Sequence, residues 1–150
     1  MQKDFLGDKP LNMEMVFDPQ SEFVGVVRLA ISGIASRMKF SIDEIEDIKI
    51  AVSEACTNAI NHAYSEEKTD KVTITVLIYP DRLEILVKDN GVGFDTSIIG
   101  TATQQKSSEA NMSLGLGLTF VESLMDETEY HSTIGEGSVI RMVKKVPQHS

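Results

Sequence analysis

Apolar residues recur three and four positions apart in three segments of the chain, which is the spacing of one face of an α-helix. The first of these segments covers residues 21–38. The second follows Ser41 and Glu44, a Ser-x-x-Glu pair that is typical of a helix N-terminus. The third extends from the glycines near residue 115 to about Asp126. The pattern therefore predicts three helices, with the second longer than the first.

Shorter segments alternate apolar and polar residues or are rich in β-branched residues, as strands are. Residues 12–17 have this pattern in part and precede an Asp-Pro break. Residues 71–79 and 82–88 are separated by Pro-Asp and predict an antiparallel hairpin. Residues 127–133 and 138–146 flank a glycine-containing turn and predict a second hairpin. We therefore expect a mixed, mostly antiparallel sheet.

The segment between the first hairpin and the third helix has neither periodicity. Residues 96–112 are rich in Ser, Thr and Gln, and a loop of this length in a compact domain is usually functional. We interpret it as a lid over a site, at about residues 95–114, and we expect a flexible N-terminus at about residues 1–10. Because no repeat or linker is visible, residues 1–150 are expected to form a single domain. Its expected fold class is an α/β (α+β) two-layer sandwich with helices on one face of the sheet.

Charge and composition narrow the classes of function. The formal net charge is −9 with only 14 Lys and Arg residues, and this disfavours nucleic-acid binding, which relies on basic residues that face phosphates. A macromolecular partner is therefore expected to be a protein. No segment approaches the ~20 apolar residues of a membrane span. The single cysteine, Cys56, has no partner for an intramolecular disulfide, so we expect no membrane association and a cytoplasmic location.

Three polar residues, Glu54, Asn58 and His62, follow one another at four-residue spacing in the second predicted helix. This spacing places them on one face, where burial would be costly unless a polar group faced them. Asn58 offers a neutral oxygen that suits Mg²⁺, and Glu54 could accept a proton from an attacking hydroxyl near a γ-phosphate. A solvated helix face is the alternative for the stripe, and His62 could simply form a hydrogen bond at the helix end.

Two glycine-containing motifs follow. Asp89, which comes directly after a predicted strand, precedes Gly91 and Gly93; its carboxylate could accept a hydrogen bond from the exocyclic amino group of adenine. An Asp-x-Gly turn that ends a strand is the alternative. Gly115 and Gly117 lie at the expected start of the third helix, where unpaired N–H groups favour phosphate. The spacing matches neither a dinucleotide fingerprint nor a P-loop, so the ordered motifs indicate an ATP site of another kind.

These motifs resemble those of a known family. E-x-x-x-N at 54–58, D-x-G-x-G at 89–93 and G-L-G-L at 115–118 resemble the N, G1 and G2 boxes of the GHKL ATPase/kinase superfamily, which has the Bergerat nucleotide-binding fold. Within this superfamily, residues 42–64 and 116–127 are similar to the bacterial anti-sigma factor serine kinases. The resemblance covers nearly the whole chain.

The resemblance implies a homodimer that binds one of two protein partners at a time. It implies that the protein sequesters a sigma factor of the sigma-B type, or phosphorylates a serine of an anti-anti-sigma factor with ATP and Mg²⁺, leaving ADP. By position, Glu54 matches the catalytic base, Asn58 the magnesium ligand and Asp89 the adenine-binding carboxylate. Ser138 matches a hydroxyl position of the adenine site. Arg28 matches a position of sigma-factor contact, and a solvated helix arginine is the alternative. The nucleotide-binding residues implied in total are Asn58, His62, Asp89, Gly91, Gly93, Gly115, Leu116, Gly117, Leu118 and Ser138.

The chain departs from the family pattern at two positions. Leu114 stands where many relatives have another glycine, and the expected lid contains Lys106 but no arginine. Two other functions remain open. A histidine-kinase-like catalytic domain would share the fold, although no histidine of the chain lies in a dimerisation helix. A nucleotide-dependent binding module without kinase activity would not require Glu54.

Overall fold

The structure of the chain, a computed structural model, describes residues 9–63, 70–90, 109–133 and 137–147. Within these residues the elements follow one another as β1 (Leu11–Phe17), α1 (Phe23–Ala35), α2 (Ile42–Ala63), β2 (Val72–Ile78), β3 (Arg82–Asp89), α3 (Glu109–Leu124), β4 (Glu127–Thr133) and β5 (Gly137–Lys145). The three predicted helices, the first strand and both predicted hairpins are confirmed.

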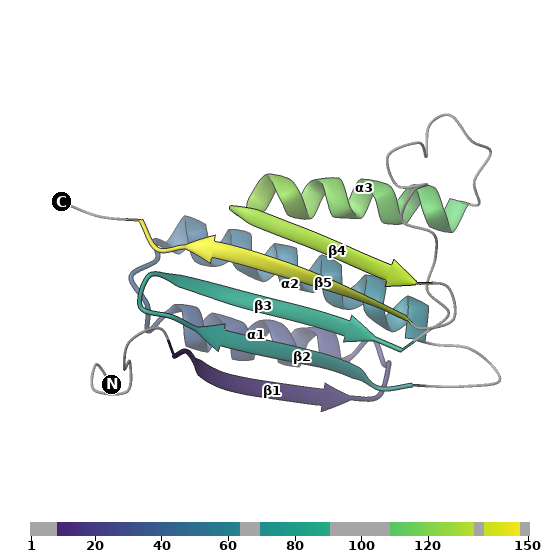
Figure 1. Cartoon of the computed structure of the whole chain (residues 1–150), viewed down its shortest axis with the longest axis horizontal. Coiled ribbons are helices and arrows are strands. Elements are labelled where there is room, and N and C mark those ends of the chain that lie inside the picture. The colour runs from purple at the N-terminus through teal and green to yellow at the C-terminus, as the bar shows by residue number, and fades with distance from the viewer. Residues whose placement is uncertain (1–8, 64–69, 91–108, 134–136, 148–150) are drawn as a thin grey trace.

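The strands form one five-stranded sheet in the order β1-β2-β3-β5-β4. Every pairing in it is antiparallel, so the predicted fold class is confirmed without any parallel component among the described strands. Figure 1 shows α1 and α2 behind this sheet, on one face, and α3 beside β4. The ends of α2 and β3 and the beginning of β5 meet at the right-hand end of that view.

Helix α2 begins with the predicted capping box. The Ser41 backbone N–H donates to Glu44 Oε1 at 2.7 Å, and the Glu44 N–H donates to Ser41 Oγ at 3.1 Å. Two N–H groups that would lack partners at a helix start are thereby satisfied. From this start the helix runs for 22 residues, which carries its second half to the end of β3.

The core lies between the helices and the sheet. Alternate residues of β2 and β3 are buried against α1 and α2, as expected for strands with one face covered. The largest fully buried side chains include Ile31, Ile48, Val52, Ile74, Ile85, Val121 and Met142. Cys56 is also buried in this core and unpaired.

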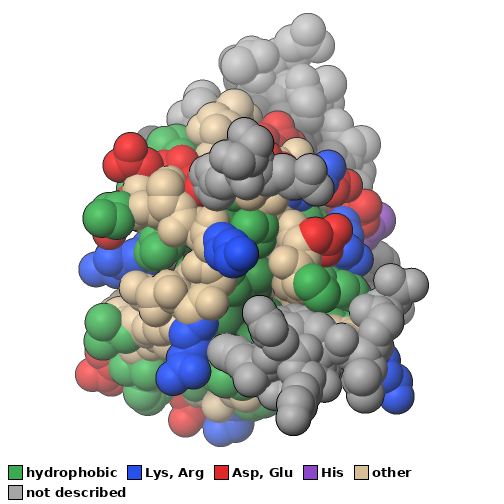
Figure 2. All heavy atoms as spheres, turned by 90° about the vertical axis from the view of Figure 1, so that its left-hand side faces the viewer, with side chains coloured by type: hydrophobic (Ala, Val, Ile, Leu, Met, Phe, Trp, Pro, Cys, Tyr) green, Lys and Arg blue, Asp and Glu red, His purple; other side chains and the backbone are tan. Residues whose placement is uncertain are grey.

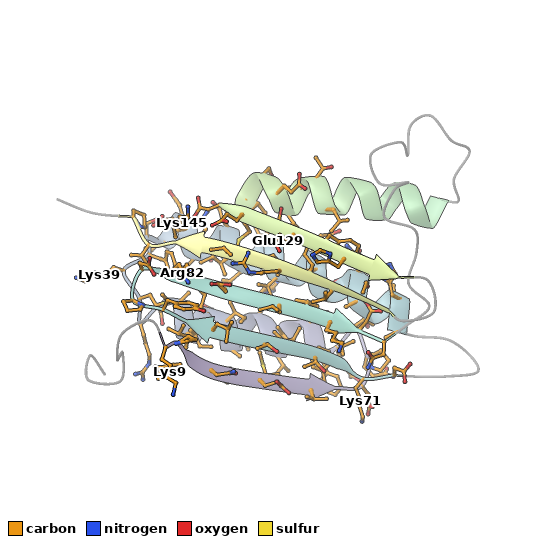
Figure 3. All side chains as sticks on the ribbon, in the orientation of Figure 1. Lys9, Lys39, Lys71, Arg82, Glu129 and Lys145 are labelled. Carbon is orange, nitrogen blue, oxygen red and sulfur yellow. The ribbon has the colours of Figure 1, made fainter. Side chains whose placement is uncertain are left out.

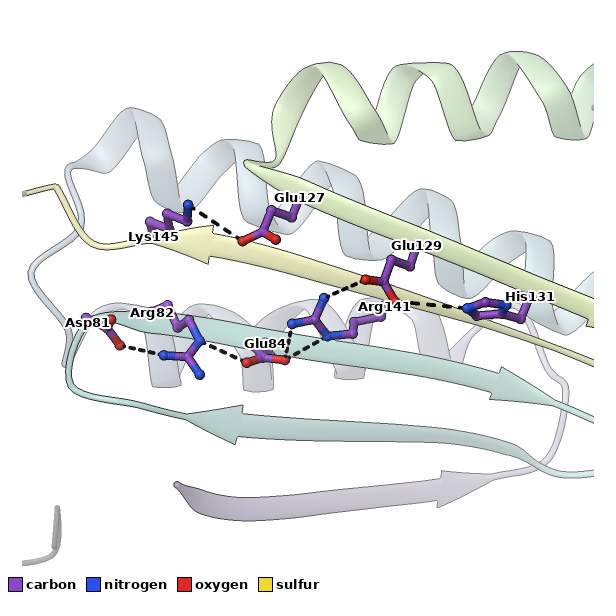
Figure 4. Close-up of polar contacts among 8 residues, drawn as sticks. All are labelled: Asp81, Arg82, Glu84, Glu127, Glu129, His131, Arg141 and Lys145. Carbon is purple, nitrogen blue, oxygen red and sulfur yellow. Dashed lines mark hydrogen bonds and ion pairs between the residues drawn. The ribbon is translucent and has the colours of Figure 1, made fainter. Parts of the chain in front are cut away.

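No helix of the described residues covers the other face of the sheet, which carries paired charges instead. Glu84 is only 5% exposed and accepts hydrogen bonds from Arg82 Nε at 2.9 Å and from Arg141 Nε at 2.8 Å (Figure 4). Arg82 also lies 3.6 Å from the ring centroid of Tyr79. Figure 3 shows Arg82 and Glu129 on this open face.

Helix α3 begins earlier than the sequence predicted. It starts at Glu109, so Gly115 and Gly117 lie inside the helix and not at its start. Glycine is less favourable than alanine in a helix by ~1 kcal/mol, so two glycines close together favour a helix boundary over a helix interior. The end of the predicted lid, residues 109–114, is therefore helical. The rest of the lid, including Lys106, lies outside the described residues, and so do residues 1–8 of the predicted flexible N-terminus.

The end of the molecule away from the α2–β3 junction has a mixed surface. In Figure 2, basic and acidic side chains alternate with apolar ones on this end, so its described side chains form no continuous basic patch. None of the helices in the described segments has the length and apolar character needed to cross a membrane.

Candidate active site

The candidate site is a pocket at the end of the sheet where β3 ends and β5 begins. Asp89, the last residue of β3, pairs with Ser138 of β5. The pocket is small, with a cavity volume of about 10 Å³ and about 240 Å³ of empty space when open solvent is included. It is lined by Ala55, Asn58, Ala59, His62, Val87, Asp89, Leu118, Tyr130, Ser138 and Ile140. Five of the predicted residues therefore meet in one pocket. They are Asn58 and His62 of α2, Asp89 of β3, Leu118 of α3 and Ser138 of β5.

Asp89 is the buried carboxylate of this pocket. It is 2% exposed, and Ser138 Oγ donates a hydrogen bond of 2.5 Å to its Oδ2. His62 Nδ1 lies 3.7 Å from the same oxygen, so the imidazole adds to the polar environment of the carboxylate. Because a buried carboxylate is costly unless it is hydrogen-bonded, the serine and the histidine explain how Asp89 can stay in this position.

Gly137 permits the close approach of β5 to the end of β3. Its φ is +88°, a left-handed conformation that favours glycine. A Cβ on this residue would collide with the Asp89 carbonyl oxygen and with Asn90 Cα. The glycine therefore allows the next residue, Ser138, to reach the Asp89 side chain.

Gly117 brings α3 against the polar stripe of α2. A Cβ on Gly117 would collide with Glu54 Oε1 and would lie 3.2 Å from Asn58 Nδ2. Glu54 and Asn58 therefore face the backbone of α3 and not bulk solvent, which excludes the alternative of a wholly solvated helix face. Their partner is an interior turn of α3, so the prediction that Gly117 lies at a helix start is wrong, while its expected contact with nucleotide remains a prediction.

The Asn58 side chain fits the role of a magnesium ligand. Its Nδ2 is buried and has no hydrogen-bond partner within the described part of the chain, so this donor calls for an acceptor such as a phosphate oxygen, and the Oδ1 of the same amide is the atom that could bind Mg²⁺. Magnesium in nucleotide sites takes one or two protein oxygens together with waters and phosphate oxygens, so the single amide oxygen of Asn58 suffices and Glu54 is not needed as a ligand.

Tyr130 is a pocket residue that was not predicted from the sequence. This β4 residue lines the pocket, and burial, followed by the charge of Asp89, raises the pKa of its phenol to about 12, although the hydroxyls of Ser138 and Ser132 act in the opposite direction. Strand alternation was the available signal, because Tyr130 and Ser132 are two residues apart and share the face that carries Ser138.

Four further residues are predicted to bind nucleotide. Gly91 and Gly93 lie outside the described residues, and Gly115 and Leu116 belong to α3 by their backbone alone. Their expected contact with nucleotide remains a prediction, as does the effect of Leu114.

Comparison with known proteins places this geometry in a family. Residues 17–144 match the family described as "Histidine kinase-like ATPase domain". The chain has 18% sequence identity to a histidine kinase domain from Erythrobacter litoralis EL346 blue-light activated histidine kinase, with a TM-score of 0.55. That similarity covers 84% of this chain and 60% of the solved one, and it supports the fold alone.

Several curated relatives have a higher sequence identity to the chain than this histidine kinase domain. The chain is 46% identical over 127 residues to the serine-protein kinase RsbW of Bacillus subtilis strain 168, covering 82% of this chain and 79% of the relative. It is 43% identical over 136 residues to RsbW of Bacillus licheniformis, covering 88% and 84%. A third RsbW, from Bacillus cereus strain B4264, is 41% identical over 138 residues, covering 89% and 84%. The chain therefore belongs to the histidine kinase-like ATPase domain family and, within it, to the RsbW serine-protein kinases.

Proposed function

We propose that this protein uses ATP to phosphorylate a serine of an anti-anti-sigma factor, and that it captures and inhibits a sigma factor of the sigma-B type when it is not engaged with that substrate. The kinase function rests mainly on one observation. Gly117 lets α3 pack directly on Glu54 and Asn58, beside the pocket that holds Asp89. This arrangement supports a single site in which Glu54 accepts a proton, Asn58 binds a cation and Asp89 binds adenine; Glu54 lies beside the pocket and is not part of its lining.

In the proposed complex, adenine occupies the end of the pocket next to Asp89 and Ser138. The buried carboxylate accepts a hydrogen bond from the exocyclic amino group, and a charged acceptor strengthens such a bond. The pocket lining continues along α2 from His62 to Asn58 and Ala55, so the phosphates extend toward Glu54.

Asn58 is the residue that would hold Mg²⁺, and the ion would supply positive charge that neutralises the phosphates. Glu54, one helical turn earlier, accepts the proton of the incoming serine hydroxyl. The serine oxygen then bonds to the γ-phosphorus, and the bond from that phosphorus to the β-phosphate oxygen breaks, leaving ADP.

The proposed protein-binding surface includes the outer side of α1. Val26 is 58% exposed and Leu29 is 74% exposed, and the exposed Arg28 lies between them in sequence. Exposed apolar side chains together with a cation on the same helix suit a protein partner better than solvent. We assign sigma-factor capture to this surface, and we also propose that the protein is a cytoplasmic homodimer that acts in the stress response.

The test of the kinase proposal is phosphoryl transfer by a Glu54→Ala variant to the purified antagonist protein. We expect transfer to fall by about 10²–10⁴-fold, the usual contribution of a general base, while the Kd for ATP changes little. Glu46→Ala is the matched control, because Glu46 lies exposed on the same helix and pairs with half-buried Lys49.

Unchanged transfer by Glu54→Ala would refute the assigned base. Acid treatment of the product separates the alternatives, because phosphoserine survives acid whereas phosphohistidine is hydrolysed. An acid-labile product would indicate a histidine-kinase-like activity. A wild-type protein that binds ATP but transfers no phosphate would be a binding module.

Sigma-factor capture is tested by recovery of partners from cell extract with and without ATP. We expect the wild-type protein to retain a sigma factor and Arg28→Glu to lose it. Arg37→Glu is the control, since Arg37 is exposed and lies just beyond the end of α1. Recovery of no transcription subunit under either condition would argue against this part of the proposal.

A further inference from the structure

Tyr130 lies in the pocket but has no part in the chemistry described above. Alternate residues of β4 point to opposite sides of the sheet, and Glu129 and His131 lie on the open face (Figure 4). Tyr130, between them in sequence, packs against the hydrophobic core and lines the pocket. A phenol at this position brings a hydroxyl into an otherwise largely apolar part of the wall.

The strand register connects this hydroxyl to the adenine end of the pocket. Tyr130 lies opposite Ile140, and Ser132 lies opposite Ser138. On the other side of β5, Ser138 lies opposite Asp89. Ser138 is therefore the diagonal neighbour of Tyr130, at a separation that an aromatic side chain can span.

The direction of hydrogen bonding follows from the protons available. Ser138 has one hydroxyl proton and donates it to Asp89 Oδ2, so toward Tyr130 it can act only as an acceptor. Burial and the charge of Asp89 raise the pKa of the Tyr130 phenol to about 12, so the phenol keeps its proton at neutral pH and can donate. A donor to Ser138 strengthens the bond that Ser138 makes to the carboxylate, because hydrogen bonds in a chain polarise one another.

We propose that Tyr130 is a positioning residue for adenine recognition: when the base binds, the Tyr130 hydroxyl, which makes no hydrogen bond to Ser138 in this structure, donates to Ser138, and Ser138 in turn fixes the rotation of the Asp89 carboxylate toward the exocyclic amino group of the base. This inference rests on the proposed ATP-binding function and adds a residue that determines its specificity. Tyr130 acts through Ser138 and does not itself touch the reacting atoms.

The experiment compares two nucleotides on the Tyr130→Phe variant of the full chain. ATP carries the 6-amino group, whereas purine riboside 5′-triphosphate lacks it and is otherwise the same. We expect Tyr130→Phe to weaken ATP binding by about threefold to tenfold, the value of one hydrogen bond, and to leave binding of the analogue unchanged. Ser138→Ala should weaken ATP binding too, and the double variant should lose little more than Ser138→Ala alone.

Tyr79→Phe is the matched control, because Tyr79 lies next to the turn between β2 and β3, beside Arg82 and away from the pocket. A thermal unfolding curve of each variant shows that the fold is kept. Equal losses for both nucleotides, or no loss for either, would overturn the inference and leave the proposed function intact. A wild-type protein that fails to bind ATP at all would instead refute the proposed function, and this inference with it.

Discussion

At the scale of single residues, the site depends on how buried polar side chains find partners. Asp89 is buried and accepts from Ser138, and its charge is the feature that can distinguish one base from another. Chemistry and spacing were sufficient to predict Glu54, Asn58, His62 and Asp89, because their polarity conflicts with the apolar segments around them. Ser138 entered only through the family resemblance.

The first residue-scale prediction concerns Asp89→Asn. The amide keeps the shape of the side chain but removes the negative charge, and a hydrogen bond to a charged group contributes ~1.5–3 kcal/mol. We expect the Kd for ATP to rise about tenfold to a hundredfold, as measured by calorimetric titration. Asp81→Asn is the control, since that carboxylate is exposed and pairs with Arg82 at the other end of β3. Equal affinity of wild-type and Asp89→Asn proteins for ATP would contradict the adenine assignment.

At the scale of elements, two helices decide whether the site exists. The capping box sets the start of α2, and 22 residues of helix then carry Glu54 and Asn58 to the end of the sheet. Helix α3 must approach α2 closely at the same place, and Gly117 permits that approach. The sequence predicted both helices but not their contact, because a glycine inside a helix looks the same whether it packs against another chain segment or not.

Gly117→Ala tests this contact between helices. In an exposed helix, alanine is ~1 kcal/mol more favourable than glycine, but here the new Cβ would collide with the Glu54 carboxylate. Because that carboxylate is the far end of a flexible side chain, we expect it to shift with little change in the free energy of unfolding, and we expect loss of most phosphoryl transfer because the proposed base is displaced. Chemical denaturation and the transfer assay measure the two effects.

Gly33→Ala in α1 is the matched control for this substitution. No atom lies within 4 Å of the position that its Cβ would occupy, so we expect it to stabilise the protein by ~0.5–1 kcal/mol. If Gly117→Ala stabilised the protein to the same extent and kept its activity, close packing of α3 on the polar stripe would not be required.

At the scale of the whole molecule, the sheet order brings distant segments to one end. Strand β5 lies between β3 and β4, so the pocket receives Asp89 from the first hairpin and both Ser138 and Tyr130 from the second. Cys56 lies in the core beneath this site and is completely buried. Burial raises the pKa of its thiol to about 12.

The hidden thiol provides a whole-molecule prediction. Thiolate is the reactive form, so at pH 8 a thiol reagent should modify the native protein at least about a thousandfold more slowly than the unfolded chain, consistent with ordinary domain stability. ATP should slow the reaction further by stabilising the native state. Rapid modification of the native protein would show that the core around Cys56 opens locally.

The same thiol predicts a pH dependence of stability. Its folded pKa is raised from the ordinary value of 9.0 to about 12, so its contribution is fully present below pH 9 and is lost as the pH rises toward 12. The raised pKa of Tyr130 adds a similar loss between pH 10 and about 12. The difference between wild type and Cys56→Ala in denaturant titrations across this range isolates the cysteine, and identical declines would contradict its contribution.

The sequence by itself determined the elements, the hairpins, the capped start of α2 and the polar stripe, since these depend on periodicity and on interactions between residues close in the chain. Only the tertiary structure decided that α3 starts at Glu109, that Gly117 lies against Glu54, and that Tyr130 stands beside Ser138 and Asp89. These facts depend on the order of strands in the sheet and on the distance between packed helices. Local sequence patterns contain neither, because both are set by the burial of side chains from segments far apart in the chain.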